Sequence, residues 1–188
     1  HGIGHRGRHL VMLDAAAQRR SVSVAGAEIS YTAMGEGPTV VLLHGLGEAS
    51  VVWFRNVEKL SEQFSVYAPD LWGHGRSADI GPYSLDTGVG FLLGFLDALS
   101  IGSAHVVGNS LGGLVTINTA LHSPERIRSM VLEGSAGLGR ELPAFLRVMT
   151  VPLLGELMAM PRRGSLKRLM RLLMRHPEEA TEEFLSAL

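Results

Sequence analysis

The stretch AHVVGNSLGG, residues 104–113, decides the fold of this 188-residue chain. Its first half is an apolar run typical of a buried strand, and a helical pattern follows directly. Glycines at positions 108 and 112 flank Ser110, so the backbone can turn too tightly for a side chain at either position. A serine on such a strand–turn–helix junction projects its hydroxyl at the positive end of the helix. The stretch therefore predicts a nucleophilic serine, Ser110.

Apolar runs alternate with helical patterns on both sides of this stretch. The run over residues 40–43 is apolar at every position, as expected for a strand that helices cover on both faces. Earlier, SVSV and AEISYTAM read as the strands of an antiparallel hairpin. We expect an α/β fold with a mostly parallel sheet and flanking helices. The predicted strands after the hairpin are 40–45, 65–70, 104–108 and 129–134, and the predicted helices are near 51–64, 85–100 and after 110.

The chain divides into three predicted regions. Residues 1–20 are interpreted as an N-terminal tail without the apolar run of a signal peptide, and residues 21–137 as the α/β core. Residues 138–188 have helical periodicity that prolines at 143, 152 and 161 interrupt. The chain has no initiator methionine and stops inside a helical pattern, which favours a part of a longer polypeptide.

Composition narrows the class of function. Seventeen basic and eighteen acidic residues nearly cancel, so we expect no nucleic-acid partner. Hydrophobic residues at 46% and charged residues at 19% are typical of a soluble globular protein. The absence of cysteine excludes disulfides, thiolate metal sites and a thiol nucleophile, and fits a cytoplasmic location. No cluster of carboxylates and histidines has metal-ligand spacing, so we expect no metal and no cofactor.

A second loop follows the predicted strand at 40–43 and contains His44, Gly45, Leu46 and Gly47. The backbone N–H of Leu46 is a candidate oxyanion donor, together with the N–H of Leu111. Three residues, His44, Gly45 and Asn109, are predicted to line the substrate site. A rival interpretation takes this loop as a dinucleotide fingerprint with Asp70 on the ribose. Ser50 at the third glycine position, and the lack of a phosphate-loop lysine, disfavour that rival.

Three segments, VVLLHGLG, APDLWGHGRS and VVGNSLGG, occur in this order at residues 40–47, 68–77 and 106–113. In them the chain resembles the α/β-hydrolase family, over about residues 21–137. The resemblance implies that residues 138–188 begin a helical cap after the sixth strand. It also implies that Asp70 and His74 belong to a structural loop.

The resemblance implies a catalytic histidine after the last strand, beyond residue 188. The triad acid is expected beyond the chain as well, or at Glu133. Without a base a serine hydroxyl is a poor nucleophile, so the chain alone is expected to be nearly inactive.

The segments GNSLGG and EGSAGLGREL look similar to hydrolases that cleave carbon–carbon bonds of ring-fission diketones, and also to carboxylesterases. The expected reaction is attack of Ser110 on the carbonyl carbon of a small apolar ester or diketone-type substrate. The alternative is a non-catalytic protein of the same fold that binds a small molecule or a partner.

Residues 162–175 combine six basic side chains with an apolar set. They could lie on an anionic membrane surface, although a cap helix with a solvated basic face is favoured. The sequence leaves the oligomeric state open.

Overall fold

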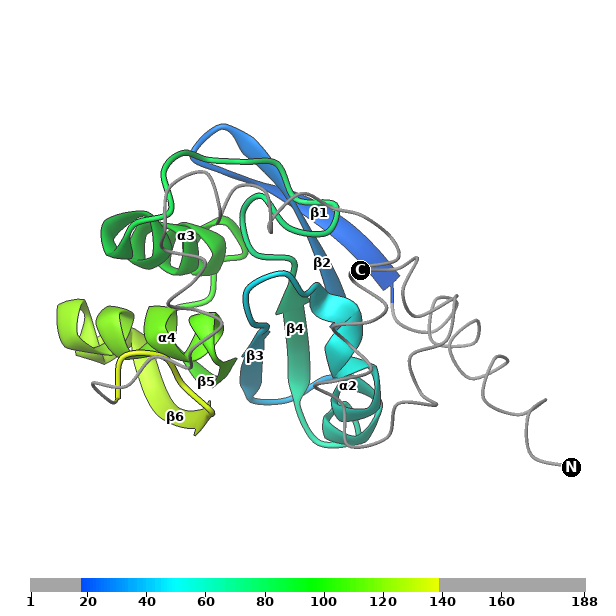
Figure 1. The fold of residues 1–188 in the computed structure, drawn as a ribbon. Helices are drawn as coiled ribbons and strands as arrows, with labels where there is room; N and C mark the ends of the chain where they lie inside the picture. Colours follow the sequence, from blue (N-terminus) through cyan, green and yellow to red (C-terminus); the bar gives the residue numbers. More distant parts are fainter. Residues whose placement is uncertain (1–17, 139–188) are drawn as a thin grey trace, which may run out of the picture. The chain divides into compact units, whose positions relative to one another are not determined.

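The computed structural model describes residues 18–138, which contain a six-stranded sheet with the order β1-β2-β4-β3-β5-β6 (Figure 1). β2 pairs antiparallel with β1 and β4, whereas the pairs β3–β4, β3–β5 and β5–β6 are parallel. The predicted α/β fold, with a mostly parallel sheet that begins with an antiparallel hairpin, is therefore confirmed. The strands are β1 (Gln18–Val24), β2 (Ala27–Met34), β3 (Thr39–Leu43), β4 (Ser65–Pro69), β5 (Ala104–Asn109) and β6 (Ile127–Glu133).

β1 begins within the predicted tail, because residues 18–20 already pair with β2. Arg19 lies opposite Thr32 in this ladder, and its guanidinium reaches Asp70 at the end of β4. The basic residues at 19 and 20 resemble the rest of the tail in composition, and this likeness hid the start of the strand. The remaining tail, residues 1–17, and the predicted cap with its basic residues at 162–175 lie outside the described residues.

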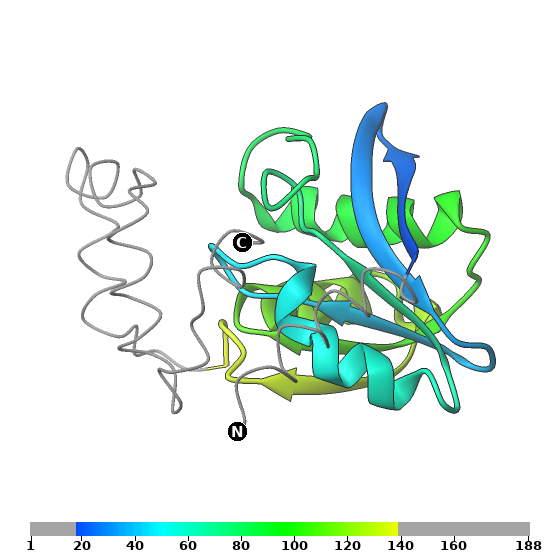
Figure 2. The same cartoon turned by 90° about the vertical axis from the view of Figure 1, so that its right-hand side faces the viewer.

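Helices cover both faces of the sheet. One cluster of buried side chains joins α3 and α4 to the sheet and includes Val41 and Leu43 of β3. A second cluster joins η1 and α2 to the other face and includes Val40 and Leu42. Figure 2 looks onto the face that α2 covers. The helical elements are η1 (Ser50–Trp53), α2 (Phe54–Leu60), α3 (Leu85–Ala98), α4 (Leu111–His122) and η2 (Pro124–Arg126).

β3 is buried on both faces, as its unbroken apolar run predicts. Its successive side chains point to opposite faces of the sheet, so neither face can be polar. Val41, Leu42 and Leu43 are fully buried. Among residues 18–138, no helix has both the length and the apolar character needed to cross a membrane.

α4 begins unusually close to the sheet. A Cβ on Gly112 would overlap the carbonyl oxygen of Leu43 in β3, and one on Gly108 would lie 2.5 Å from the carbonyl oxygen of Gly112. Both carbonyl oxygens belong to the backbone, so they cannot move without displacing the strand or the helix. Glycine at 108 and 112 therefore lets β5 turn directly into α4.

Gly112→Ala is expected to destabilise the protein by about 2 kcal/mol or more, because the added methyl group has no free space. Gly90 offers a matched control in α3, since nothing lies within 4 Å of an added Cβ there. Gly90→Ala should be neutral or stabilise by about 0.5–1 kcal/mol through helix propensity. Urea unfolding followed by circular dichroism measures both changes. Equal stability of the two variants would contradict the close approach of α4 to β3.

Candidate functional site

Ser110 stands between the last residue of β5 and the first residue of α4, with φ 47° and ψ −108°. Among the described residues, only Ala25, Ser100 and Ser110 have a positive φ without being glycine. The ψ of Ser110 also lies outside the left-handed helical region, so its backbone is strained by about 1–3 kcal/mol. Such strain persists only where neighbouring structure fixes it.

Three main-chain hydrogen bonds fix the Ser110 backbone. Its N–H donates to the carbonyl oxygen of Glu133 at the end of β6, over 3.0 Å. Its own carbonyl oxygen accepts from the N–H groups of Leu114, at 3.1 Å, and Ala136, at 3.0 Å. The turn at Ser110 is therefore tied to β6, to α4 and to the segment that follows β6.

The predicted oxyanion loop lies directly beside this turn. A Cβ built on Gly45 would be 3.3 Å from Cβ of Ser110 and 3.0 Å from Oδ1 of Asn109. Three of the predicted site residues, Gly45, Asn109 and Ser110, are thus brought together. Leu111 begins α4, where the first N–H groups have no acceptor within the helix. Leu46 follows Gly45 and is 53% exposed. The roles of the Leu46 and Leu111 amides as oxyanion donors stay predictions.

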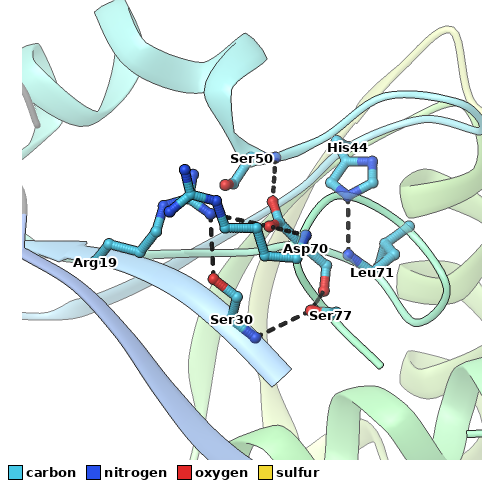
Figure 3. A network of polar contacts seen from close by, with 8 residues as sticks. Arg19, Ser30, His44, Ser50, Asp70, Leu71 and Ser77 are labelled. Carbon is cyan, nitrogen blue, oxygen red and sulfur yellow. Dashed lines mark hydrogen bonds and ion pairs between the residues drawn. The ribbon is translucent and has the colours of Figure 1, made fainter. Parts of the chain in front are cut away.

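His44 is fully buried, and both of its ring nitrogens are used within the protein. Nε2 accepts from the N–H of Leu71 at 2.8 Å (Figure 3). Nδ1 therefore carries the proton and donates to the carbonyl oxygen of Gly45 at 2.8 Å. Burial, with a smaller contribution from the nearby His74, lowers the pKa of His44 to about 4, although the hydrogen bond to Gly45 and the charge of Asp70 act in the raising direction. This neutral imidazole joins the loops after β3 and β4. Its predicted contact with substrate stays a prediction.

Asp70 is the centre of the polar network in Figure 3. Oδ1 accepts from the N–H of Ser50 at 2.7 Å, and Oδ2 accepts from the Arg19 guanidinium at 3.1 Å and the N–H of Arg76 at 3.0 Å. Burial alone would raise the pKa of Asp70, but hydrogen bonds from Ser50 and Arg76 and the charge of Arg19 outweigh burial and lower it. The ionised carboxylate is thus occupied within the fold, which gives it a structural role.

The loop after β4 is also fastened to the hairpin. The hydroxyl of Ser77 donates to the carbonyl oxygen of Asp70 at 2.7 Å and accepts from the N–H of Ser30 at 3.0 Å. Nδ1 of His74 lies 2.8 Å from the carbonyl oxygen of Trp72. Both observations agree with a structural loop at residues 70–77. Within residues 18–138, no group of three or more histidine, aspartate or glutamate side chains could hold a metal ion.

A pocket of about 270 Å³ opens between this loop and the starts of α3 and α4. One wall is the ring pair of Trp72 and Tyr83, stacked with centroids 5.6 Å apart. Another wall contains Leu111, the residue that follows Ser110. The lining is mostly apolar and consists of Trp72, Tyr83, Ser84, Leu85, Leu111, Leu114 and Val115.

Sequence reasoning missed Glu48. Its Oε2 accepts from the N–H of Gly45 at 2.8 Å, and its own N–H donates to the Gly45 carbonyl oxygen at 3.3 Å. Burial raises the pKa of Glu48 and the charge of Glu133 raises it further, while the Gly45 bond and His74 lower it. The only signal in the sequence is an acidic residue three positions after Gly45, which is common in turns.

Comparisons with known proteins agree with this fold. A family model described as alpha/beta hydrolase fold matches residues 38–181. An uncharacterised protein of Mycobacterium tuberculosis is 33% identical over 144 residues, which cover 74% of this chain and 41% of that protein. A 2-hydroxy-6-oxo-6-phenylhexa-2,4-dienoate hydrolase of Comamonas testosteroni is 33% identical over 164 residues, 84% of this chain and 57% of the relative. The chain thus spans about half the length of these relatives.

Solved structures are similar as well. A meta-cleavage product hydrolase from Pseudomonas fluorescens IP01 superimposes with a TM-score of 0.75 at 32% identity. The match covers 89% of this chain and 61% of that one. The two proteins are therefore similar in sequence as well as in fold.

His44→Gln should flatten the dependence of stability on pH. The His44 pKa falls from 6.5 to about 4 on folding. Between these values the unfolded chain binds a proton that the folded protein does not. The stability from neutral His44 is therefore complete above pH 6.5 and lost as the pH falls to about 4, a total of about 3 kcal/mol.

Urea unfolding at a series of pH values measures this slope. His122→Gln, which alters an exposed histidine at the end of α4, is the control for loss of a histidine elsewhere in the fold. If His44→Gln keeps the wild-type slope, the buried neutral imidazole is not the source.

Proposed function

The chain belongs to the alpha/beta hydrolase fold family, and from this premise we propose that it is part of a serine hydrolase. In this proposal Ser110 attacks the carbonyl carbon of a small apolar ester or diketone-type substrate. The observation that carries it is the strained Ser110 backbone at the start of α4, beside the Gly45 loop. A plain helix-capping serine would require neither the strain nor the second loop.

The proposed reaction begins with removal of the Ser110 hydroxyl proton by a histidine. The serine oxygen then bonds to the carbonyl carbon, and negative charge develops on the carbonyl oxygen. The N–H groups of Leu46 and Leu111 hold this oxyanion, helped by the positive end of α4. No metal or other cofactor takes part.

In this proposal the base lies beyond residue 188, where the resemblance to the family implies it, and two described histidines in the loops after β3 and β4 have other partners. His44 uses both ring nitrogens on backbone groups, and His74 contacts the Trp72 carbonyl oxygen. The acid that orients the base lies beyond the chain or is Glu133. Glu133 ends β6, and its backbone already contacts Ser110.

The pocket beside Leu111 supports an apolar substrate. Its aromatic and aliphatic walls would favour a phenyl or short alkyl group by excluding water from it. Several relatives are named as hydrolases of 2-hydroxy-6-oxo-dienoates, including the Comamonas testosteroni enzyme, whose name specifies a phenyl substituent. These relatives favour carbon–carbon cleavage over general ester hydrolysis. The cytoplasmic location and the absence of a nucleic-acid partner stay predictions.

A fluorophosphonate probe, which forms a stable adduct only with an activated serine, tests the proposal by intact-mass analysis. The natural gene product that carries this chain should be labelled once, at Ser110, and its Ser110→Ala variant should not be labelled. The 188-residue chain alone should label at least about 100-fold more slowly, since it lacks the proposed base. Failure of the natural product to label would favour a non-catalytic binder. Rapid labelling of the 188-residue chain would mean that a base lies within it.

A further inference from the structure

Glu48 forms two hydrogen bonds with Gly45, and they close the turn that residues 45–48 make. Its side chain returns to the N–H of Gly45, and its backbone N–H reaches the carbonyl oxygen of the same residue. Glu48 is half-buried, and its carboxyl group lies against Gly45, close to the turn at Ser110. A Cβ on Gly45 would be 3.0 Å from Oε2 of Glu48, which places this oxygen in the same small space as Asn109 and Ser110.

These contacts determine the direction of the Leu46 N–H. The carbonyl oxygen of Gly45 and the N–H of Leu46 belong to one planar peptide unit, in which they point in opposite directions. Nδ1 of His44 and the N–H of Glu48 hold that carbonyl oxygen. The Glu48 carboxyl group holds the N–H of the preceding peptide unit. With both neighbouring peptide units fixed, Gly45 has little freedom left to rotate.

We propose that Glu48 is a positioning residue, whose carboxyl oxygen locks the Gly45 backbone so that the Leu46 N–H is held ready for an oxyanion at Ser110. This inference rests on the proposed function. It gives a role to a polar side chain that belongs neither to the turn at Ser110 nor to the polar network around Asp70. Glycine at 45 needs such a lock because it has more conformational freedom than any other residue.

The role requires a hydrogen-bond acceptor and no charge. A carboxylate here lies near Glu133, and its charge would oppose negative charge on a substrate oxygen. Burial and the charge of Glu133 both raise the pKa of Glu48 and so favour its neutral form. A neutral carboxyl group still accepts the Gly45 N–H through its carbonyl oxygen. A glutamine should therefore replace Glu48 well.

Two variants whose side chains are nearly equal in size distinguish the effect of the hydrogen-bond acceptor from the effect of side-chain volume. In the natural gene product, Glu48→Gln keeps an oxygen for the Gly45 N–H, and Glu48→Met removes it. With 4-nitrophenyl butyrate as the probe substrate, Glu48→Met should lower kcat by about tenfold or more and leave KM within about twofold, since loss of a whole oxyanion donor lowers kcat by about 10²–10³. Glu48→Gln should stay within about threefold of wild type. Glu62→Met is the control for loss of an exposed carboxylate and should change nothing.

The results separate the two proposals. Equal activity of Glu48→Met and wild type would overturn the assignment. A Glu48→Gln variant as slow as Glu48→Met would overturn it as well, since a hydrogen-bond acceptor alone would then not be sufficient. If wild type and Ser110→Ala are both inactive, the proposed function fails and the assignment fails with it. Thermal unfolding of each variant checks that a lower kcat does not come from partial unfolding.

Nuclear magnetic resonance on the 188-residue chain tests the contact without any activity. The Gly45 amide resonance should titrate with Glu48 in wild type, with a midpoint above the ordinary carboxyl value of 4.5. It should lose this titration in Glu48→Gln. A Gly45 resonance that behaves identically in both proteins would overturn the assignment.

Discussion

The site depends on the close passage of α4 over the end of β3, which only glycine permits. Gly112 touches the backbone of Leu43, and Gly108 touches the backbone of Gly112. This contact leaves the chain no room for an ordinary turn, so the connecting residue, Ser110, takes up a strained conformation. Main-chain bonds to β6 and to the segment after it hold the strain in place. The same passage brings the loop that follows Leu43 against the serine.

The loops on this edge of the sheet are fixed by two buried groups whose pKa values both fall, for different reasons. Desolvation disfavours the charged form of a buried group, so His44 becomes neutral and can accept the Leu71 N–H. Asp70 is equally inaccessible, but several donors and the Arg19 guanidinium keep it ionised. Each group has partners suited to its charge state, and unpaired burial of either would be destabilising. The loops after β3 and β4 are thereby held together.

The sequence predicted those features of the structure that depend on residues close together in the chain. The turn at Ser110 follows from the spacing of the glycines around it, and the burial of β3 on both faces follows from its apolar run. Each of these patterns lies within a stretch of ten residues. The polar network could not be predicted in the same way, because Arg19 and Asp70 are 51 residues apart and His44 and Leu71 are 27 apart. Arg19 looked like part of a basic tail for the same reason. Glu48 is close in sequence to Gly45, but a single acidic residue in a turn carries no signal of what its side chain contacts.

The two kinds of groups that a serine hydrolase needs differ in how they depend on the rest of the protein. Amide donors are fixed by main-chain geometry, and in the described residues hydrogen bonds hold the backbone of both Gly45 and Ser110. A base acts only when its side chain lies within hydrogen-bond reach of the serine hydroxyl. In the proposed function the base comes from residues beyond this chain. In that proposal the oxyanion donors are already held in place while Ser110 is still protonated, and activation of Ser110 is a separate step that requires the base.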